Sequence, residues 1–214
     1  MPRSKSSGRW LDRQHRDPYV QKARKAGARS RAIFKLEELD RRDRLLKPGM
    51  TVVDLGAAPG GWSQYAAQRV GARGRVIALD ILPMDPIPGV EVLEGDFTAE
   101  AVLREMESRL GARPADLVIS DMAPNMTGIG ITDQARSMML AELALEFATQ
   151  YLRTGGDFLV KTFQGAGFTE FLRELRGRFG EVLSRKPPAS RSESREIYLL
   201  GKGFKGAVEP ASGA

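Results

Sequence analysis

The sequence predicts an α/β fold in which a doubly wound, mostly parallel sheet ends in an antiparallel strand. The prediction depends on the spacing of short β-rich runs, on one glycine-rich loop and on a closely spaced pair of runs near the end of the chain. The first five runs are mostly separated by segments long enough for crossover helices, which is the pattern of a parallel sheet covered on both faces. These runs are 51–55, 75–80, 90–93, 116–120 and 157–160.

A helix is expected before the first of these strands. From Ser30 onward, Ile33, Leu36 and Leu39 recur at helical spacing, followed by Leu45 and Leu46. The Lys-Pro-Gly sequence at 47–49 should end this helix, because proline and glycine interrupt helical structure.

The end of the chain predicts a different arrangement. The β-rich runs 181–185 and 196–200 flank Lys186-Pro187-Pro188 and are too close together for a crossover helix between them. We therefore expect these two strands to pair antiparallel.

The length of 214 residues suits one domain, which we place at residues 19–205, with a basic disordered arm at 1–18 and a flexible tail at 206–214. Residues 1–31 contain ten basic and two acidic side chains, a net charge of +8, whereas the whole chain carries +6. A basic arm on a slightly acidic body indicates a polyanionic partner such as RNA. A merely solubilising arm is the alternative.

Composition excludes several kinds of chemistry. The chain has no cysteine, and its one histidine is His15, so disulfides, a cysteine nucleophile and a thiolate or histidine-rich metal site are not expected. No metal is predicted at all. The sequence also lacks an apolar run of membrane-spanning length and a secretory signal, so we expect a cytoplasmic protein without membrane contact.

The glycine-rich loop directly follows the first predicted strand. It reads Asp54-Leu55-Gly56-Ala57-Ala58-Pro59-Gly60-Gly61-Trp62, and a helix is expected next, at 63–70. Glycines at a helix N-terminus let the backbone approach a ligand closely. The spacing is not the G-x-G-x-x-G of a dinucleotide site, which makes NAD a less attractive ligand.

Four acidic residues lie at or just past the carboxyl ends of four different predicted strands, the edge at which open α/β sheets bind ligands. Asp80 is also spaced suitably to bind ribose hydroxyls. Each acid taken singly could be a turn or cap residue, and Trp62 could simply be a core aromatic. The four acids are Asp54, Asp80, Asp96 and Asp121.

Two lysines and a glutamate are expected near Asp121. Lys161 ends the fifth predicted strand, and Glu196 begins the antiparallel strand, so both should lie at the same sheet edge as Asp121. Lys35, on the helix before the sheet, could reach over this edge. The alternative is two surface ion pairs, which contribute only about 0–1 kcal/mol each.

Together these segments make the sequence resemble the FtsJ/RlmE family of ribosomal RNA large-subunit 2′-O-methyltransferases, from about Tyr19 to Lys202. The resemblance implies the seven-stranded, Rossmann-like methyltransferase sheet. It depends on the segments 30–36 (SRAIFKL), 54–64 (DLGAAPGGWSQ), 120–125 (SDMAPN), 160–165 (VKTFQG) and 191–196 (RSESRE).

The resemblance also implies site residues. The Lys-Asp-Lys-Glu tetrad of the family falls on Lys35, Asp121, Lys161 and Glu196, with Lys161 as the proton acceptor. Residues for the cofactor, S-adenosyl-L-methionine, fall on Gly60, Trp62, Asp80, Asp96 and Asp121. Burial and a second cation lower the pKa of a lysine and carboxylates raise it, so the sequence leaves the balance at such a base open.

The substrate implied by the resemblance is a uridine in the aminoacyl-site loop of large-subunit rRNA on the assembled particle, modified by a monomer that does not act on DNA. Three alternatives stay open: a tRNA 2′-O-methyltransferase, an mRNA-cap 2′-O-methyltransferase, and an RNA-binding ribosome assembly factor without turnover. A base-amino methyltransferase is disfavoured, because Asp121-Met122-Ala123-Pro124 lacks the Asp/Asn-Pro-Pro-aromatic motif of that class.

Overall fold

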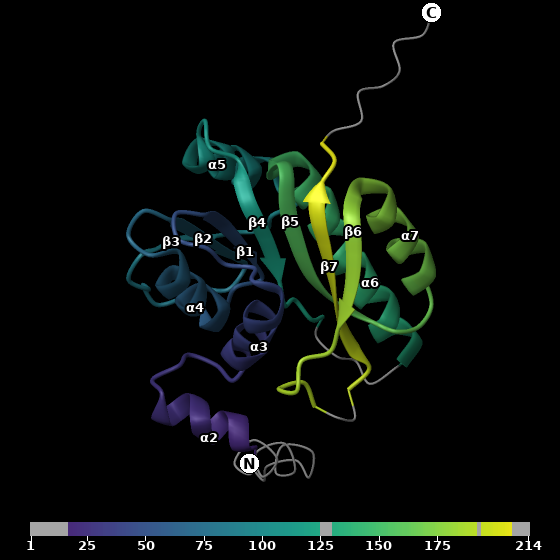
Figure 1. The fold of residues 1–214 in the computed structure, drawn as a ribbon, viewed down its shortest axis with the longest axis horizontal. Helices are drawn as coiled ribbons and strands as arrows, with labels where there is room; N and C mark the ends of the chain where they lie inside the picture. The colour runs from purple at the N-terminus through teal and green to yellow at the C-terminus, as the bar shows by residue number, and fades with distance from the viewer. Residues whose placement is uncertain (1–16, 125–129, 192–193, 207–214) are drawn as a thin grey trace, which may run out of the picture.

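A computed structural model of the chain describes residues 17–124, 130–191 and 194–206. A seven-stranded sheet lies between two layers of helices (Figure 1). The strand order is β3-β2-β1-β4-β5-β7-β6. The strands are β1 (Thr51–Leu55), β2 (Arg75–Asp80), β3 (Val90–Glu94), β4 (Ala115–Ser120), β5 (Leu152–Phe163), β6 (Phe179–Arg185) and β7 (Glu196–Phe204).

The pairing confirms the expected mixed sheet. β1 to β5 run parallel to one another, and β7 runs antiparallel to both β5 and β6. In Figure 1 the arrowhead of β4 points down and that of β7 points up, so the carboxyl edge of the parallel strands is the lower one. The start of β7 therefore meets the end of β5 at that edge.

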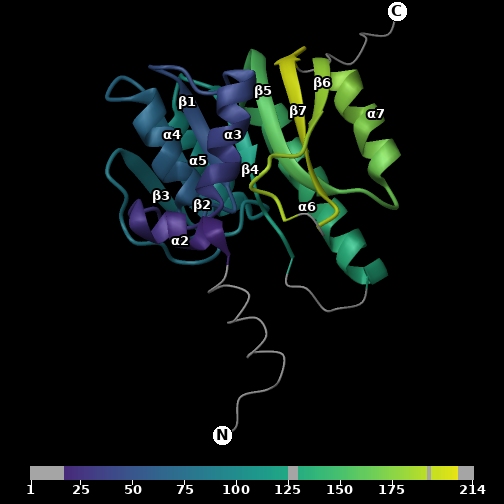
Figure 2. The same ribbon diagram turned by 60° about the horizontal axis from the view of Figure 1, so that its bottom comes forward.

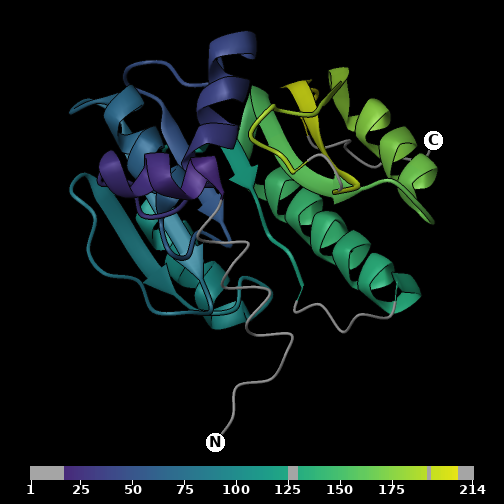
Figure 3. The ribbon, with the colours of Figure 1, turned by 90° about the horizontal axis from the view of Figure 1, so that it is seen from below.

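Helices cover both faces of the sheet, as the turned views show (Figures 2 and 3). On one face, α3 and α4 pack in a core cluster that includes Leu36, Ala66 and Leu159. On the other, α5, α6 and α7 pack in a cluster that includes Met106, Phe147 and Phe171. The helices are α2 (Pro18–Lys25), α3 (Ile33–Asp43), α4 (Gly61–Val70), α5 (Glu100–Leu110), α6 (Gly130–Tyr151) and α7 (Phe168–Arg178).

The helix before the sheet is shorter than predicted. α3 ends at Asp43, because Arg44 adopts a left-handed conformation, and Leu45 and Leu46 are buried outside the helix. A side-chain oxygen of Asp40 accepts a hydrogen bond from the Leu46 amide at 2.8 Å, which holds the chain in this turn. The apolar spacing correctly predicted burial and incorrectly predicted a continued helix.

β5 is longer than predicted at both ends. Its first residue, Leu152, pairs with Ala115 across a register irregularity in the β4 pairing, and its last, Phe163, pairs with Glu196 of β7. Lys161 therefore lies two residues before the end of the strand and does not terminate it.

The first described helix, α2, begins at Pro18 and is capped by Asp17, whose carboxylate accepts a hydrogen bond from the Tyr19 amide at 3.0 Å. The rest of the predicted arm at 1–18, and the predicted tail apart from Gly206, lie outside the described residues. Within the described parts, no helix is both long enough and apolar enough to cross a membrane.

Candidate active site

The sheet topology brings the predicted tetrad residues to one edge. Asp121 directly follows β4, and Lys161 lies on the neighbouring strand β5. Glu196 opens β7, which pairs with β5 so that Lys161 stands opposite Tyr198. Lys35 comes from the first turn of α3, which covers this face of the sheet.

The four side chains form a continuous chain of ion pairs. Lys161 Nζ lies 3.0 Å from Asp121 Oδ1. Lys35 Nζ lies 3.8 Å from the same oxygen and 2.9 Å from Glu196 Oε1. These are not the exposed surface pairs of the alternative interpretation, because the Lys161 side chain is only 7% exposed and the other three are at most 17% exposed.

A fifth residue, Tyr198, joins this cluster and was missed by the sequence analysis. Its hydroxyl donates to Asp121 Oδ1 at 2.6 Å and accepts a hydrogen bond from Lys35 Nζ at 3.1 Å. The residue is fully buried. Strand alternation was the available signal, because Tyr198 lies two residues after Glu196 and therefore on the same face of β7.

The lysines keep the two site carboxylates ionised. Burial raises the pKa of Asp121, but the charges of Lys161 and Lys35 and the hydrogen bond from Tyr198 outweigh it, so the pKa falls below the usual 3.8. Burial likewise raises the pKa of Glu196, but the charge of Lys35, 2.9 Å away, outweighs it, so this pKa falls below the usual 4.5. At neutral pH both groups carry negative charge.

Lys161 is held at two points. Besides its ion pair with the Asp121 carboxylate, its Nζ donates to the Asp121 backbone carbonyl at 2.6 Å. Asp121 Oδ1 forms ion pairs with Lys161 and Lys35 and accepts a hydrogen bond from the Tyr198 hydroxyl. The oxygen therefore faces the Lys161 ammonium and the Tyr198 hydroxyl at close range and the charge of Lys35 at 3.8 Å, while the amine of Lys161 is fixed in position.

The glycine-rich loop leads from β1 into α4, as predicted. Gly60 precedes the helix in a left-handed conformation, with φ 99° and no side-chain cap for the helix N-terminus. A Cβ at this position would lie 2.4 Å from Cδ1 of Ile87, so both the backbone conformation and the packing require glycine. The first amides of α4 are thereby left without a side-chain acceptor from residue 60.

Asp80 is the last residue of β2, and Asp96 lies two residues after the end of the neighbouring strand β3. The Asp80 carboxylate accepts hydrogen bonds from the Ala58 amide and the Leu82 amide, both at 2.8 Å. Asp96 is exposed, and Thr98 donates both its amide and its hydroxyl to Asp96 Oδ1, at 2.9 and 2.7 Å. The carboxylates thus have the turn-capping roles of the alternative interpretation, which leaves their role toward a cofactor a prediction.

Asp54 does not lie open in a crevice as predicted. It is 1% exposed, and its Oδ2 accepts a hydrogen bond from the Ser63 hydroxyl at 2.6 Å. Burial raises its pKa to about 7, opposed by Ser63 and reinforced by the charges of Asp121 and Asp80. Asp54 therefore ties β1 to the first turn of α4 from beneath the loop.

Trp62 lies behind the tetrad. It is 3% exposed, its indole Nε1 donates to the Ala32 carbonyl at 2.7 Å, and its ring lies 5.8 Å from that of Tyr198. This packing supports Tyr198 and the start of α3. A role for Trp62 as a wall of the cofactor pocket stays a prediction.

Comparison with known proteins gives consistent matches. Residues 28–204 match the family described as FtsJ-like methyltransferase. A protein of Alkalilimnicola ehrlichii named ribosomal RNA large subunit methyltransferase E is 59% identical over 202 residues, covering 94% of this chain and 97% of the relative. A protein of the same name from Stenotrophomonas maltophilia is 60% identical over 201 residues, covering 94% and 96%.

Solved structures share the fold. A ribosomal RNA methyltransferase structure from Plasmodium falciparum superposes with a TM-score of 0.77 at 33% identity, covering 84% of this chain and all of that one. An rRNA methylase structure from Clostridium thermocellum superposes with a TM-score of 0.55 at 20% identity, covering 80% and 97%, which supports the fold alone.

Proposed function

Because the chain belongs to the FtsJ-like methyltransferase family, we propose that it transfers a methyl group from S-adenosyl-L-methionine to a ribose 2′-hydroxyl of large-subunit rRNA. The observation that carries the proposal is the buried cluster of Lys35, Asp121, Lys161 and Glu196 at the carboxyl edge of the sheet. The names of the bacterial relatives support the rRNA substrate. Following the family resemblance, the target is a uridine in the aminoacyl-site loop.

The residues around the glycine-rich loop fit the cofactor. Gly60 leaves the N-terminus of α4 without a side-chain cap, and such a terminus suits the carboxylate of the methionine part. Asp80 is fixed at the end of β2 by two backbone amides, and a carboxylate oxygen can accept further hydrogen bonds from ribose hydroxyls. Bound there, S-adenosylmethionine supplies an electrophilic methyl group on a positively charged sulfur.

In this mechanism Lys161 is the base. The ribose oxygen would form its new bond to the methyl carbon as the carbon–sulfur bond breaks and leaves a neutral thioether, and the hydroxyl proton would pass to the amine of Lys161. Asp121 fixes that amine through its carboxylate and its backbone carbonyl. The carboxylate oxygen that faces Lys161 also accepts the Tyr198 hydroxyl, and Lys35 places a second positive charge 3.8 Å from the same oxygen.

Lys35 is held by Glu196, its nearer carboxylate partner, and by Tyr198. We infer that this arrangement keeps one cation beside the reaction while Lys161 exchanges its proton. Glu196 and Tyr198 therefore act as positioning residues.

Product analysis tests the proposal. Large ribosomal subunits from cells lacking this protein are incubated with the purified chain and S-adenosylmethionine carrying a tritiated methyl group, and the rRNA is hydrolysed with alkali. A methylated 2′-oxygen blocks cleavage of the next phosphodiester, so we expect the label in an alkali-resistant dinucleotide. Label in an ordinary mononucleotide would place the methyl group on a base, and absence of label would support the assembly-factor alternative.

A further inference from the structure

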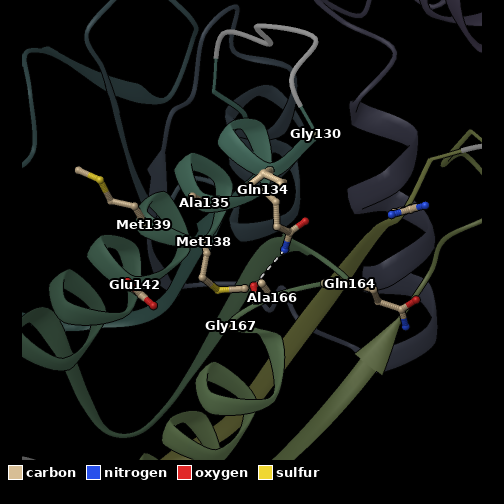
Figure 4. Close-up of a pocket in the computed structure, with 12 residues that line it drawn as sticks. Gly130, Gln134, Ala135, Met138, Met139, Glu142, Gln164, Ala166 and Gly167 are labelled. Carbon is tan, nitrogen blue, oxygen red and sulfur yellow. Dashed lines mark hydrogen bonds between the residues drawn. The ribbon is translucent and has the colours of Figure 1, made fainter.

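A pocket of about 630 Å³ lies between α6 and the segment after β5 (Figure 4), whereas the tetrad lies on the face of the sheet covered by α3. One wall is the first half of α6, with Gln134, Met138 and Met139. The other is the segment after β5, with Gln164 and Ala166. None of these residues has a part in the proposed chemistry.

The pocket is linked to the reaction site through β5 and β7, because the residues just beyond their paired ends line it. Phe163 of β5 pairs with Glu196 of β7, and the next residues, Gln164 and Arg195, both line the pocket. The Gln164 amide donates to the Arg195 carbonyl at 3.3 Å, which continues the pairing past the strand ends. Gln164 is three residues after Lys161, about 10 Å along an extended chain. The nucleotide next to a target ribose in an extended strand can reach that far.

The walls of the pocket are held by specific contacts. Gln134 Nε2 donates to the carbonyls of Phe163 at 3.1 Å and Ala166 at 3.3 Å, the latter drawn in Figure 4. A Cβ at Gly165 would lie 2.8 Å from Cδ of Gln134, and one at Gly167 would lie 3.2 Å from Cγ of Met138. Close packing at these two glycines therefore sets the separation between the loop and α6.

The lining has the chemistry of a nucleobase site. Met138 is buried beneath the pocket and Met139 is 58% exposed at its side, and thioethers make favourable contacts with aromatic faces. The exposed amide of Gln164 can donate to and accept from the edge of a base. The charges also differ along the pocket, because Arg195 adjoins the tetrad whereas Glu142 lies further along α6. A phosphate is favoured at the Arg195 end only.

We propose that this pocket binds the unstacked base of a nucleotide adjacent to the methylated one, with its phosphate at Arg195. The inference rests on the proposed function, because it takes the RNA strand at the tetrad as given. The volume of the pocket suits one nucleotide. Binding of the neighbouring base there would also explain how a ribose within a structured loop is presented at the sheet edge, because that base must leave its stack.

Filling the pocket tests the proposal. Ala166 is exposed and lines the pocket, whereas Ala72 is also exposed but lies in the turn before β2, at the opposite edge of the sheet. The phenyl ring of Ala166→Phe would occupy the space of the base, so this variant should lower kcat/KM for unmethylated large subunits about tenfold or more. S-adenosylmethionine binding should be unchanged, and the Ala72→Phe control should behave as wild type. An Ala166→Phe variant with wild-type kcat/KM overturns the proposal.

Crosslinking locates the occupant directly. Because the chain has no cysteine, Met139→Cys and the control Ala72→Cys each provide a single thiol for a short photoreactive crosslinker. After irradiation with large subunits, we expect Cys-linked rRNA only from the pocket variant, at a nucleotide directly adjacent to the one independently mapped as methylated. A crosslink to a ribosomal protein, or to rRNA remote from the methylated position, rejects the proposal. The proposed function fails separately, if the mapped methyl group is on a base.

Discussion

The buried carboxyl of Asp54 makes a quantitative prediction about stability. Its pKa of about 7 in the folded protein compares with 3.8 for an exposed carboxyl. Below about pH 4 the group is protonated in both states. Between about pH 4 and 7 the folded state binds the extra proton, so the free energy of unfolding falls as pH rises, by about 1.4 kcal/mol per pH unit. Above about pH 7 the carboxyl is ionised in both states, so the free energy of unfolding no longer changes with pH because of this group.

Replacing Asp54 with asparagine removes this ionisation and keeps an oxygen that can accept the Ser63 hydroxyl. The stability of Asp54→Asn relative to wild type should therefore increase by about 3 kcal/mol between pH 5 and pH 8. Urea unfolding of both proteins at several pH values measures this difference, and the other titrating groups are common to both. The control is Asp85→Asn, which removes a carboxylate at an exposed position. A pH-independent difference for Asp54→Asn would refute the reasoning.

Three further predictions concern the cofactor, the tetrad and the RNA. Asp80→Ala and Asp96→Ala should each weaken S-adenosylmethionine binding with the fold retained, and unchanged calorimetric affinity in both would contradict the assignment. Tyr198→Phe removes a buried hydrogen bond to an ionised carboxylate, so urea unfolding should show a loss of about 1.5–3 kcal/mol, and an unchanged midpoint would argue against that contact. Arg191, whose side chain is 35% exposed and lies 3.7 Å from the Asp17 carboxylate, is expected to contact an RNA phosphate, so Arg191→Ala should weaken RNA binding and reduce the slope of its salt dependence by about one. An unchanged slope would exclude a phosphate contact.

The tetrad could be predicted because it depends on strand order and strand ends, which local sequence encodes well. Asp121, Lys161 and Glu196 each follow, or open, an apolar run that is short and clearly bounded. The resemblance then agreed with the same positions. An error of two residues in the end of β5 did not matter, because the long side chain of Lys161 reaches Asp121 from within the strand.

Other features depend on contacts between distant segments, and the sequence alone could not provide them. Tyr198 resembles any core aromatic of a strand until β7 is placed beside β5 and α3. Asp54 was expected in the crevice, and only the position of Ser63 shows that it points beneath the loop. The pocket beside α6 likewise requires the contact between Gln134 and the loop after β5.

The central claim is that Lys161 accepts the proton of the ribose hydroxyl, and single-turnover methylation of large subunits at saturating S-adenosylmethionine tests it most directly. General-base catalysis typically contributes about a hundredfold to ten-thousandfold, so Lys161→Ala should lower the rate by about a hundredfold or more, with cofactor affinity little changed. Lys161→Arg should be similarly slow, because a guanidinium keeps its charge and cannot accept a proton. A Lys161→Arg variant that transfers methyl groups at nearly the wild-type rate would show that positive charge or positioning suffices, and it would contradict the assignment of Lys161 as the base.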